Sequence, residues 1–221
     1  MTALLPILAG FTLGCIHAFD ADHILAVTSF ASKSSSARGA AAFGLLWGLG
    51  HTATLVVLGL FSIAFRFIIP PVVESVAEMF VGGLLIAIGA WVLREVFLRK
   101  RLHIHKHVHN GVEHLHLHSH EHGESHRHRH SMFLVGATHG FAGTASVMVI
   151  IPIAITQSLG VAALYLLLFG VGTIFAMSLF AYAVGRITRR LDSGRALPVF
   201  QTVSGILSIG VGLFWIGVKA L

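Results

Sequence analysis

Long apolar runs alternate with short polar segments along almost the whole chain. A helix that crosses a bilayer needs about 20 predominantly apolar residues. Runs of this length lie at 4–31, 40–64, 72–98, 131–157, 159–185 and 197–219. They lack the two-residue alternation of a membrane β-barrel wall. The pattern therefore predicts an all-α integral membrane protein with six transmembrane helices.

Composition agrees with this fold class. Hydrophobic residues make up 55% of the 221 residues and charged residues only 11%, whereas soluble domains are about one-quarter charged. The first run has no basic residue before it and no clean small-residue cleavage pattern after it, so we interpret it as a membrane span and not as a secretory signal. Almost nothing remains for a soluble domain.

The basic residues predict an orientation. Thirteen of the fifteen follow the first, third and fifth spans: Lys33, Arg38, Arg94, Arg99, Lys100, Arg101, Lys106, Arg127, Arg129, Arg186, Arg189, Arg190 and Arg195. Because positive residues near spans favour the cytoplasm, we expect these three loops inside and both termini outside a cytoplasmic (inner) membrane. Membrane topology accounts for the positive charge, so the expected partner is the lipid bilayer, and no nucleic acid is expected.

A weak internal repeat relates the two halves of the chain. At an offset of 122 residues, 13–19 matches 135–141, 47–50 matches 169–172, and Gly83 and Leu85 match Gly205 and Leu207. A repeat with an odd number of spans enters the membrane from the opposite side, as in many transporters. The sequence thus predicts an inverted 3+3 repeat, with halves at 1–98 and 131–221 joined by a loop at 99–130.

Four ionisable residues interrupt the first span: His17, Asp20, Asp22 and His23. Charged groups inside a bilayer are costly and call for partners, water or a bound cation. On a regular helix His17, Asp20 and His23 share a face of about 120° and Asp22 points away. Asp22 can join them if the helix opens locally. It can instead hydrogen-bond to an imidazole and orient it without contacting the metal. The alternative to a metal site is a buried hydrogen-bond or salt-bridge network that fixes the packing of the helices.

Two further intramembrane histidines complete the candidate site. His51 lies in the second span beside Gly50, where small residues allow close helix packing. It is expected to be a fourth ligand or a gate. His139 is the repeat partner of His17, and ligand, gate and packing roles are equally open for it. Imidazole and carboxylate together suit divalent transition metals, and no thiolate cage is present to select a soft metal.

These residues carry a resemblance to a known family. The run His17-Ala-Phe-Asp-Ala-Asp-His-Ile24 resembles the signature of the nickel/cobalt permease superfamily, and Leu49-Gly-His-Thr52 resembles its second histidine motif. The segment 138–145 is similar to the short urease-accessory-type (UreH-like) nickel transporters. The resemblance implies Ni²⁺ or Co²⁺ transport with the first-span histidines and aspartates as ligands. The larger permeases have eight spans where six are predicted here.

The segment 99–130 is rich in histidine. It contains twelve, many at alternate positions, and such a low-complexity tract is expected to be disordered without metal and to offer several weak metal sites. The charge pattern places it in the cytoplasm, where it would receive, buffer or sense metal. A solvated linker between the repeats is the alternative.

The prediction is a secondary transporter that takes up Ni²⁺ or Co²⁺, and not an enzyme. Its metal residues are His17, Asp20, Asp22, His23, His51 and His139, and no cofactor is expected besides the transported ion. Expected partners are divalent metal ions and a cytoplasmic metallochaperone or a urease or hydrogenase maturation factor. Efflux and a nickel-binding accessory or sensor protein without transport are the alternatives. Membrane thiol–disulfide exchange is disfavoured because it needs paired cysteines, and Cys15 is alone in the chain.

Overall fold

Four long apolar helices dominate the computed structural model, which describes residues 4–65, 70–98, 105–109, 112–116, 127–141, 158–191 and 195–220. They are α3 (Ala37–Phe65), α4 (Pro71–Leu98), α7 (Leu159–Leu191) and α8 (Ala196–Ala220), and each contains a stretch long and apolar enough to cross a membrane. They match the predicted spans at 40–64, 72–98, 159–185 and 197–219. The chain is an all-α, multi-pass membrane protein.

The first predicted span is not one helix. Residues 4–31 divide into α1 (Leu4–His17) and α2 (Ala21–Ala31), joined by a turn in which Asp20 has an extended backbone, with φ −60° and ψ 147°. The expectation of a continuous helix is therefore wrong here. Neither piece has the roughly 20 residues that cross a bilayer alone. Hydrogen bonds from Ala18 N to the Gly14 carbonyl and from Asp20 N to the His17 carbonyl keep the backbone of the turn paired, as a break at membrane depth requires.

The predicted fourth span also begins differently. Helix α5 (Arg127–His139) starts inside the segment expected to be a loop and ends at His139, where Gly140 and Phe141 form a turn. The rest of that predicted span, 142–157, lies outside the described residues.

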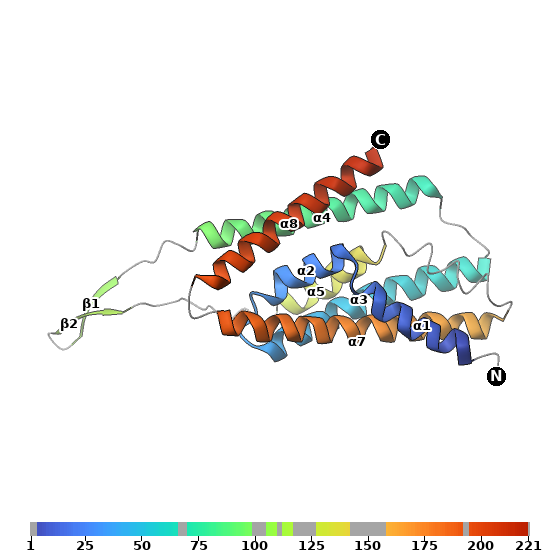
Figure 1. The fold of residues 1–221 in the computed structure, drawn as a ribbon, viewed down its shortest axis with the longest axis horizontal. Helices are drawn as coiled ribbons and strands as arrows, with labels where there is room; N and C mark the ends of the chain where they lie inside the picture. The colour runs from blue at the N-terminus through green and yellow to red at the C-terminus, as the bar shows by residue number, and fades with distance from the viewer. Residues whose placement is uncertain are drawn as a thin grey trace.

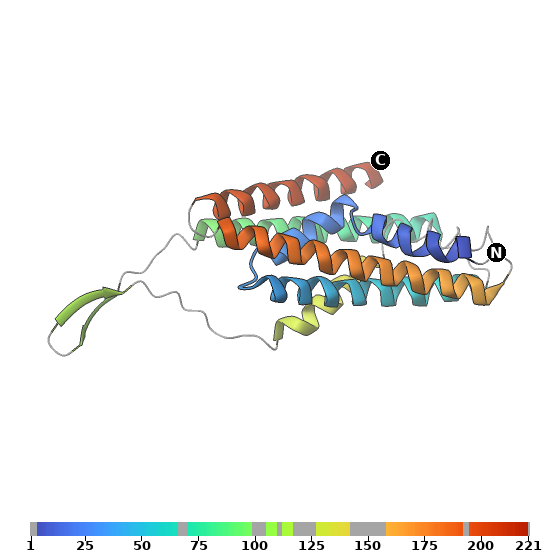
Figure 2. The same ribbon diagram turned by 60° about the horizontal axis from the view of Figure 1, so that its bottom comes forward.

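The histidine-rich segment contains some regular structure where disorder was expected. Strands β1 (His105–His109) and β2 (Val112–His116) form an antiparallel pair in which His105 is opposite His116 and His107 is opposite His114. Figure 2 shows this hairpin extending well away from the helices. Alternation of residue types with a period of two is the pattern of a strand, which accounts for the difference.

The helices form two groups with α2 between them (Figure 1). Contacts join α1 to α7, α3 to α7 and α3 to α5, whereas α4 pairs with α8. Helix α2 touches α3 and α7 on one side and α4 and α8 on the other. The larger core cluster lies at the first of these faces, where Val27 packs with Trp47, Met177 and Ala181. The position of α2 matters because the candidate site begins at its first turn.

Glycines allow the helices of the first group to touch. A Cβ added to Gly14 of α1 would collide with the Phe169 carbonyl of α7, and one added to Gly136 of α5 would collide with the Trp47 carbonyl of α3. Small residues that let backbones approach are typical of membrane helix interfaces. The two contacts hold His17 and His139, three residues further along α1 and α5, against the same bundle.

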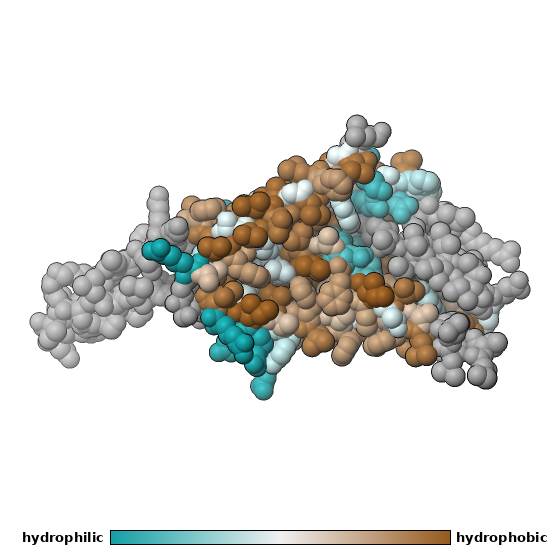
Figure 3. Space-filling model, in the orientation of Figure 1, coloured by the Kyte–Doolittle hydropathy of each residue, from teal (hydrophilic) through white to brown (hydrophobic). Residues whose placement is uncertain are grey.

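Basic residues gather at one end of the molecule. Helices α2, α4 and α7 end there and α3 and α8 begin there, and both described termini lie toward the other end (Figure 1). Lys33 follows α2 at this end and forms a 2.7 Å ion pair with Glu95 of α4. Its ammonium group also lies 3.1 Å from the centre of the Trp91 ring. Brown apolar side chains cover most of the visible helical surface between the two ends (Figure 3), as a lipid-facing surface requires.

Candidate metal centre

Three imidazoles from three helices converge at the break between α1 and α2. His17 is the last residue of α1, His23 lies in the first turn of α2 and His51 lies in the middle of α3. The Nε2 atom of His51 is 3.1 Å from Nε2 of His17 and 3.5 Å from Nε2 of His23. All three side chains are buried. The unwound turn produces this arrangement, because it redirects the chain between His17 and His23.

Two of these rings contact a carboxylate through Nδ1, the ring nitrogen that faces away from the cluster. Asp20 Oδ2 lies 2.8 Å from His17 Nδ1, and Asp22 Oδ1 lies 2.9 Å from His23 Nδ1. An ionised carboxylate only accepts hydrogen bonds, so in a neutral ring the hydrogen is on Nδ1. The Nε2 atoms of His17 and His23 are then left with their lone pairs directed at the centre of the cluster. Carboxylates behind metal-binding histidines commonly set the tautomer in this way.

Asp22 has a second partner from the other half of the chain. Its Oδ2 atom accepts a 2.6 Å hydrogen bond from His139 Nε2, and both side chains are buried. The remaining ring nitrogens of His51 and His139, both Nδ1, have no hydrogen-bond partner among the described residues. Two groups of possible ligand atoms thus share His23: one with His17 and His51, and one with Asp22 and His139.

All six predicted site residues lie together, and Asp22 joins them, as expected for a helix that opens locally. Asp22, which would point away on a regular helix, is almost fully buried at the centre and makes two contacts. Asp20, expected on the ligand face, has a side chain that is 39% exposed and contacts His17 at the edge of the cluster. Of the two geometries considered, the regular helix and the locally opened one, the extended backbone at Asp20 corresponds to the opened one.

Sequence reasoning did not assign the aromatic wall of this site. The Trp47 ring is stacked on His51, with centroids 5.2 Å apart and planes within 6°, and lies about 5 Å from the rings of both His23 and His139. Phe169 covers His17 at 5.3 Å. Two signals were present: Trp47 lies one helical turn before His51, and Trp47 and Phe169 are partners at the repeat offset of 122. These rings exclude water from the imidazoles.

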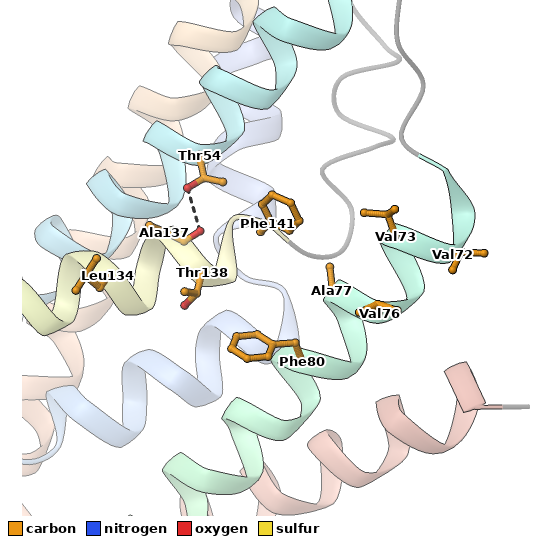
Figure 4. A pocket seen from close by; sticks show the side chains of 10 residues that line it. All are labelled: Thr54, Val72, Val73, Val76, Ala77, Phe80, Leu134, Ala137, Thr138 and Phe141. Atoms are coloured by element: carbon orange, nitrogen blue, oxygen red, sulfur yellow. Dashed lines mark hydrogen bonds between the residues drawn. The ribbon is translucent and has the colours of Figure 1, made fainter.

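A cavity of about 600 Å³ lies beside the end of α5 (Figure 4). Thr54 of α3, Phe80 of α4, Thr138 in the last turn of α5 and Phe141 just after it face this cavity. Its lining is mainly apolar, and none of the six site residues belongs to it. It is therefore a feature separate from the histidine cluster.

The family described as "Cytochrome C biogenesis protein transmembrane region" matches residues 24–214. The chain belongs to this family. It is also 30% identical over 214 residues to the urease accessory protein UreH of Bacillus sp. (strain TB-90), covering 96% of this chain and 91% of the relative. The chain is thus a UreH-like member of this membrane family.

More distant relatives are plant proteins. The Arabidopsis thaliana chloroplast proteins FOR GROWTH AND FERTILITY 1 and 2 are 26% and 25% identical, each over 207 residues and 92% of this chain. The chain spans about half the length of these two, with 56% and 54% of each covered. No solved structure matches the chain.

The description of the family does not by itself say which reaction or transport this member performs. Exchange between a dithiol and a disulfide needs two cysteines. Cys15 is the single cysteine of the chain, and its thiol points at the Gly172 carbonyl, 3.5 Å away. The concentration of histidines at the break of the first span is the feature that a function must explain.

Proposed function

We propose that this protein is a secondary transporter that takes up Ni²⁺ or Co²⁺ across the cytoplasmic membrane. The observation that carries the proposal is the convergence of three imidazole Nε2 atoms, with neighbouring pairs 3.1 and 3.5 Å apart. Nitrogens bound to one first-row divalent ion at about 2.0–2.1 Å lie about 2.9–3.4 Å from one another. The cluster has this spacing with little rearrangement.

The chemistry around the imidazoles supports a transition metal. The Nε2 atoms of His17 and His23 both face Nε2 of His51. A cation satisfies all three nitrogens at once. Imidazole suits nickel, cobalt, zinc and copper, and the similarity to a protein named as a urease accessory protein favours nickel, with a urease maturation factor as the cytoplasmic partner.

Helix contacts support the inverted repeat. The offset of 122 relates two close approaches. Gly14 lies against the Phe169 carbonyl, and their partners at this offset, Gly136 and Trp47, make the equivalent contact. The contacts of α1 with α7 and of α3 with α5 exchange in the same way. We infer six spans, in two halves of three, with the site where the halves meet. One half rocking against the other would open the site to each side in turn.

The charge distribution supports an orientation. Positive residues lie at the end of the molecule where α4 and α7 end, and such residues favour the cytoplasm. The segment 99–130 follows α4 and would therefore be cytoplasmic, with both termini outside. There it would buffer the metal that the membrane helices deliver.

Flux into proteoliposomes tests the proposal. The purified protein is reconstituted with a nickel-sensitive dye inside, and Ni²⁺ is added outside under an inside-negative potential. The wild type should give dye quenching that His51→Gln abolishes, because glutamine fills the site without an imidazole. Thr202→Ala is the matched control, since this hydroxyl bonds only to its own helix in the described structure.

The same preparation separates the alternatives. Equilibrium dialysis that finds tight Ni²⁺ binding without any flux would refute transport and favour an accessory or sensor protein. Direction is measured in cells: expression should raise intracellular nickel relative to the His51→Gln variant. Lower nickel would show efflux.

A further inference from the structure

We propose that the ion occupies two adjacent positions in turn, which share His23. The first position is formed by His17, His23 and His51. The second is formed by Asp22, His23 and His139. This inference rests on the proposed transport function and describes the path of the ion within the site.

The geometry of the second position is that of a small metal site. Asp22 Oδ2 is 2.6 Å from His139 Nε2, and Asp22 Oδ1 is 2.9 Å from His23 Nδ1. One ligand atom from each residue lies within 4.8 Å of the others. One carboxylate oxygen with two imidazole nitrogens is a donor set that divalent first-row metals accept, with positions left open for further ligands.

A hydrogen-bond donor that only fixed Asp22 in place would not need to be a histidine. The ring of His139 is 1% exposed, and its Nδ1 atom has no partner among the described residues. A buried polar atom without a partner destabilises the folded protein. A serine or asparagine could donate to Asp22 without a second ring nitrogen. An imidazole, in contrast, can turn from donor to metal ligand by moving its hydrogen from Nε2 to Nδ1.

The two positions differ in which half of the chain provides them. His17, His23 and His51 come from α1, α2 and α3, all in the first half. His139 ends α5 in the second half, so the second position exists only where the halves meet. The T-shaped packing of the His23 and His139 rings, with centroids 5.0 Å apart, places the shared ligand next to both positions. Transfer through His23, with its hydrogen moving from Nδ1 to Nε2 as the ion passes from Nε2 to Nδ1, would thus couple ion movement to the contact between the halves.

Cobalt absorption spectroscopy tests the two positions. The full chain is used with the twelve histidines of 99–130 replaced by asparagine, so that Co²⁺ reports only the four intramembrane histidines. In this background His51→Gln should retain Co²⁺ binding, weakened less than about 100-fold, with visible bands changed to those of a mixed oxygen and nitrogen site. Adding His139→Phe should remove the residual binding. Phenylalanine keeps a ring against Trp47, and His139→Gln serves as the second variant if the first does not fold.

The reciprocal variant completes the test. His139→Phe alone should bind Co²⁺ with the bands of the unsubstituted site and yet lose flux by at least about tenfold. The proposal is overturned if His51→Gln binds equally with and without His139, or if His139→Phe alone changes the bands, which would place His139 in a single common site. Wild-type protein without any flux would refute transport itself, whereas normal wild-type flux with either of these binding results would refute only the second position.

Discussion

Replacing Asp22 with asparagine should damage metal binding far more than the same change at Asp20. Asp22 is buried and uses both oxygens, at 2.9 Å from His23 Nδ1 and 2.6 Å from His139 Nε2. An asparagine in its place would offer one oxygen and one NH₂ group, so one of the two imidazoles would lose its acceptor. Asp20 makes a single contact, with His17, and its side chain is 39% exposed.

The expected magnitudes follow from these environments. Loss of a partner behind a metal-binding histidine typically costs about 10–100-fold in affinity, equivalent to about 1.4–2.7 kcal/mol. We expect Asp22→Asn to reach or exceed the upper value, because it also removes a buried charge that faces the ion. Asp20→Asn should cost less than about tenfold, since water can replace an exposed acceptor.

Isothermal titration of Ni²⁺ into the purified protein measures both variants against the wild type. The background with asparagines in place of the histidines of 99–130 removes the signal of that segment. Thermal unfolding of the metal-free proteins shows whether each variant is folded. A greater loss of affinity in Asp20→Asn than in Asp22→Asn would refute the order of burial as the basis for the roles of the two carboxylates.

Four further predictions concern packing, the ends of the helices, the loop and pH. Gly136→Ala should lower thermal stability in detergent by about 1–3 kcal/mol through overpacking, whereas Gly83→Ala, with nothing within 4 Å of the added Cβ, should not. A double-mutant cycle on Lys33→Gln and Glu95→Gln should give a coupling of about 0.5–1 kcal/mol, and zero coupling would show that their 2.7 Å contact does not contribute. Deletion of 103–130 should lower apparent affinity while flux persists, and complete loss of flux would show that this segment is part of the transport path. Flux should fall on acidification because protonated imidazoles cannot bind metal; flux that stays unchanged down to the pH at which the protein unfolds would argue against imidazole ligands.

The sequence predicted the long helices well and the broken one poorly, for a physical reason. Runs such as 72–98 and 197–219 are apolar over their whole length, and bilayer thickness alone sets their limits. At 4–31 the apolar residues on both sides of the ionisable cluster add up to the length of one span, but the backbone opens at Asp20. Span length predicts where a membrane segment lies and does not predict where the backbone opens within it.

The candidate site, too, could be predicted from the sequence only in part. The residue types of the cluster predicted metal-binding chemistry, and the structure brings all six side chains together. The position of Asp22 depended on whether the helix opens, which the residue pattern left undecided and the extended backbone at Asp20 decides. The bond between Asp22 and His139 joins residues 117 apart, and the repeat offset pairs His139 with His17, not with Asp22. Only the folded arrangement reveals that partner.

Helix α2 links the site to the opposite group of helices through a segment of 11 residues. A helix this short is not stable in isolation, so its order depends on its contacts with α3, α4, α7 and α8. One end supplies Asp22 and His23, and beyond the other end Lys33 pairs with Glu95 of α4. If an ion orders the first turn of α2 and this order favours the Lys33 contact, thermodynamic linkage makes the effect mutual: loss of that contact would weaken ion binding by the factor by which the ion strengthens it.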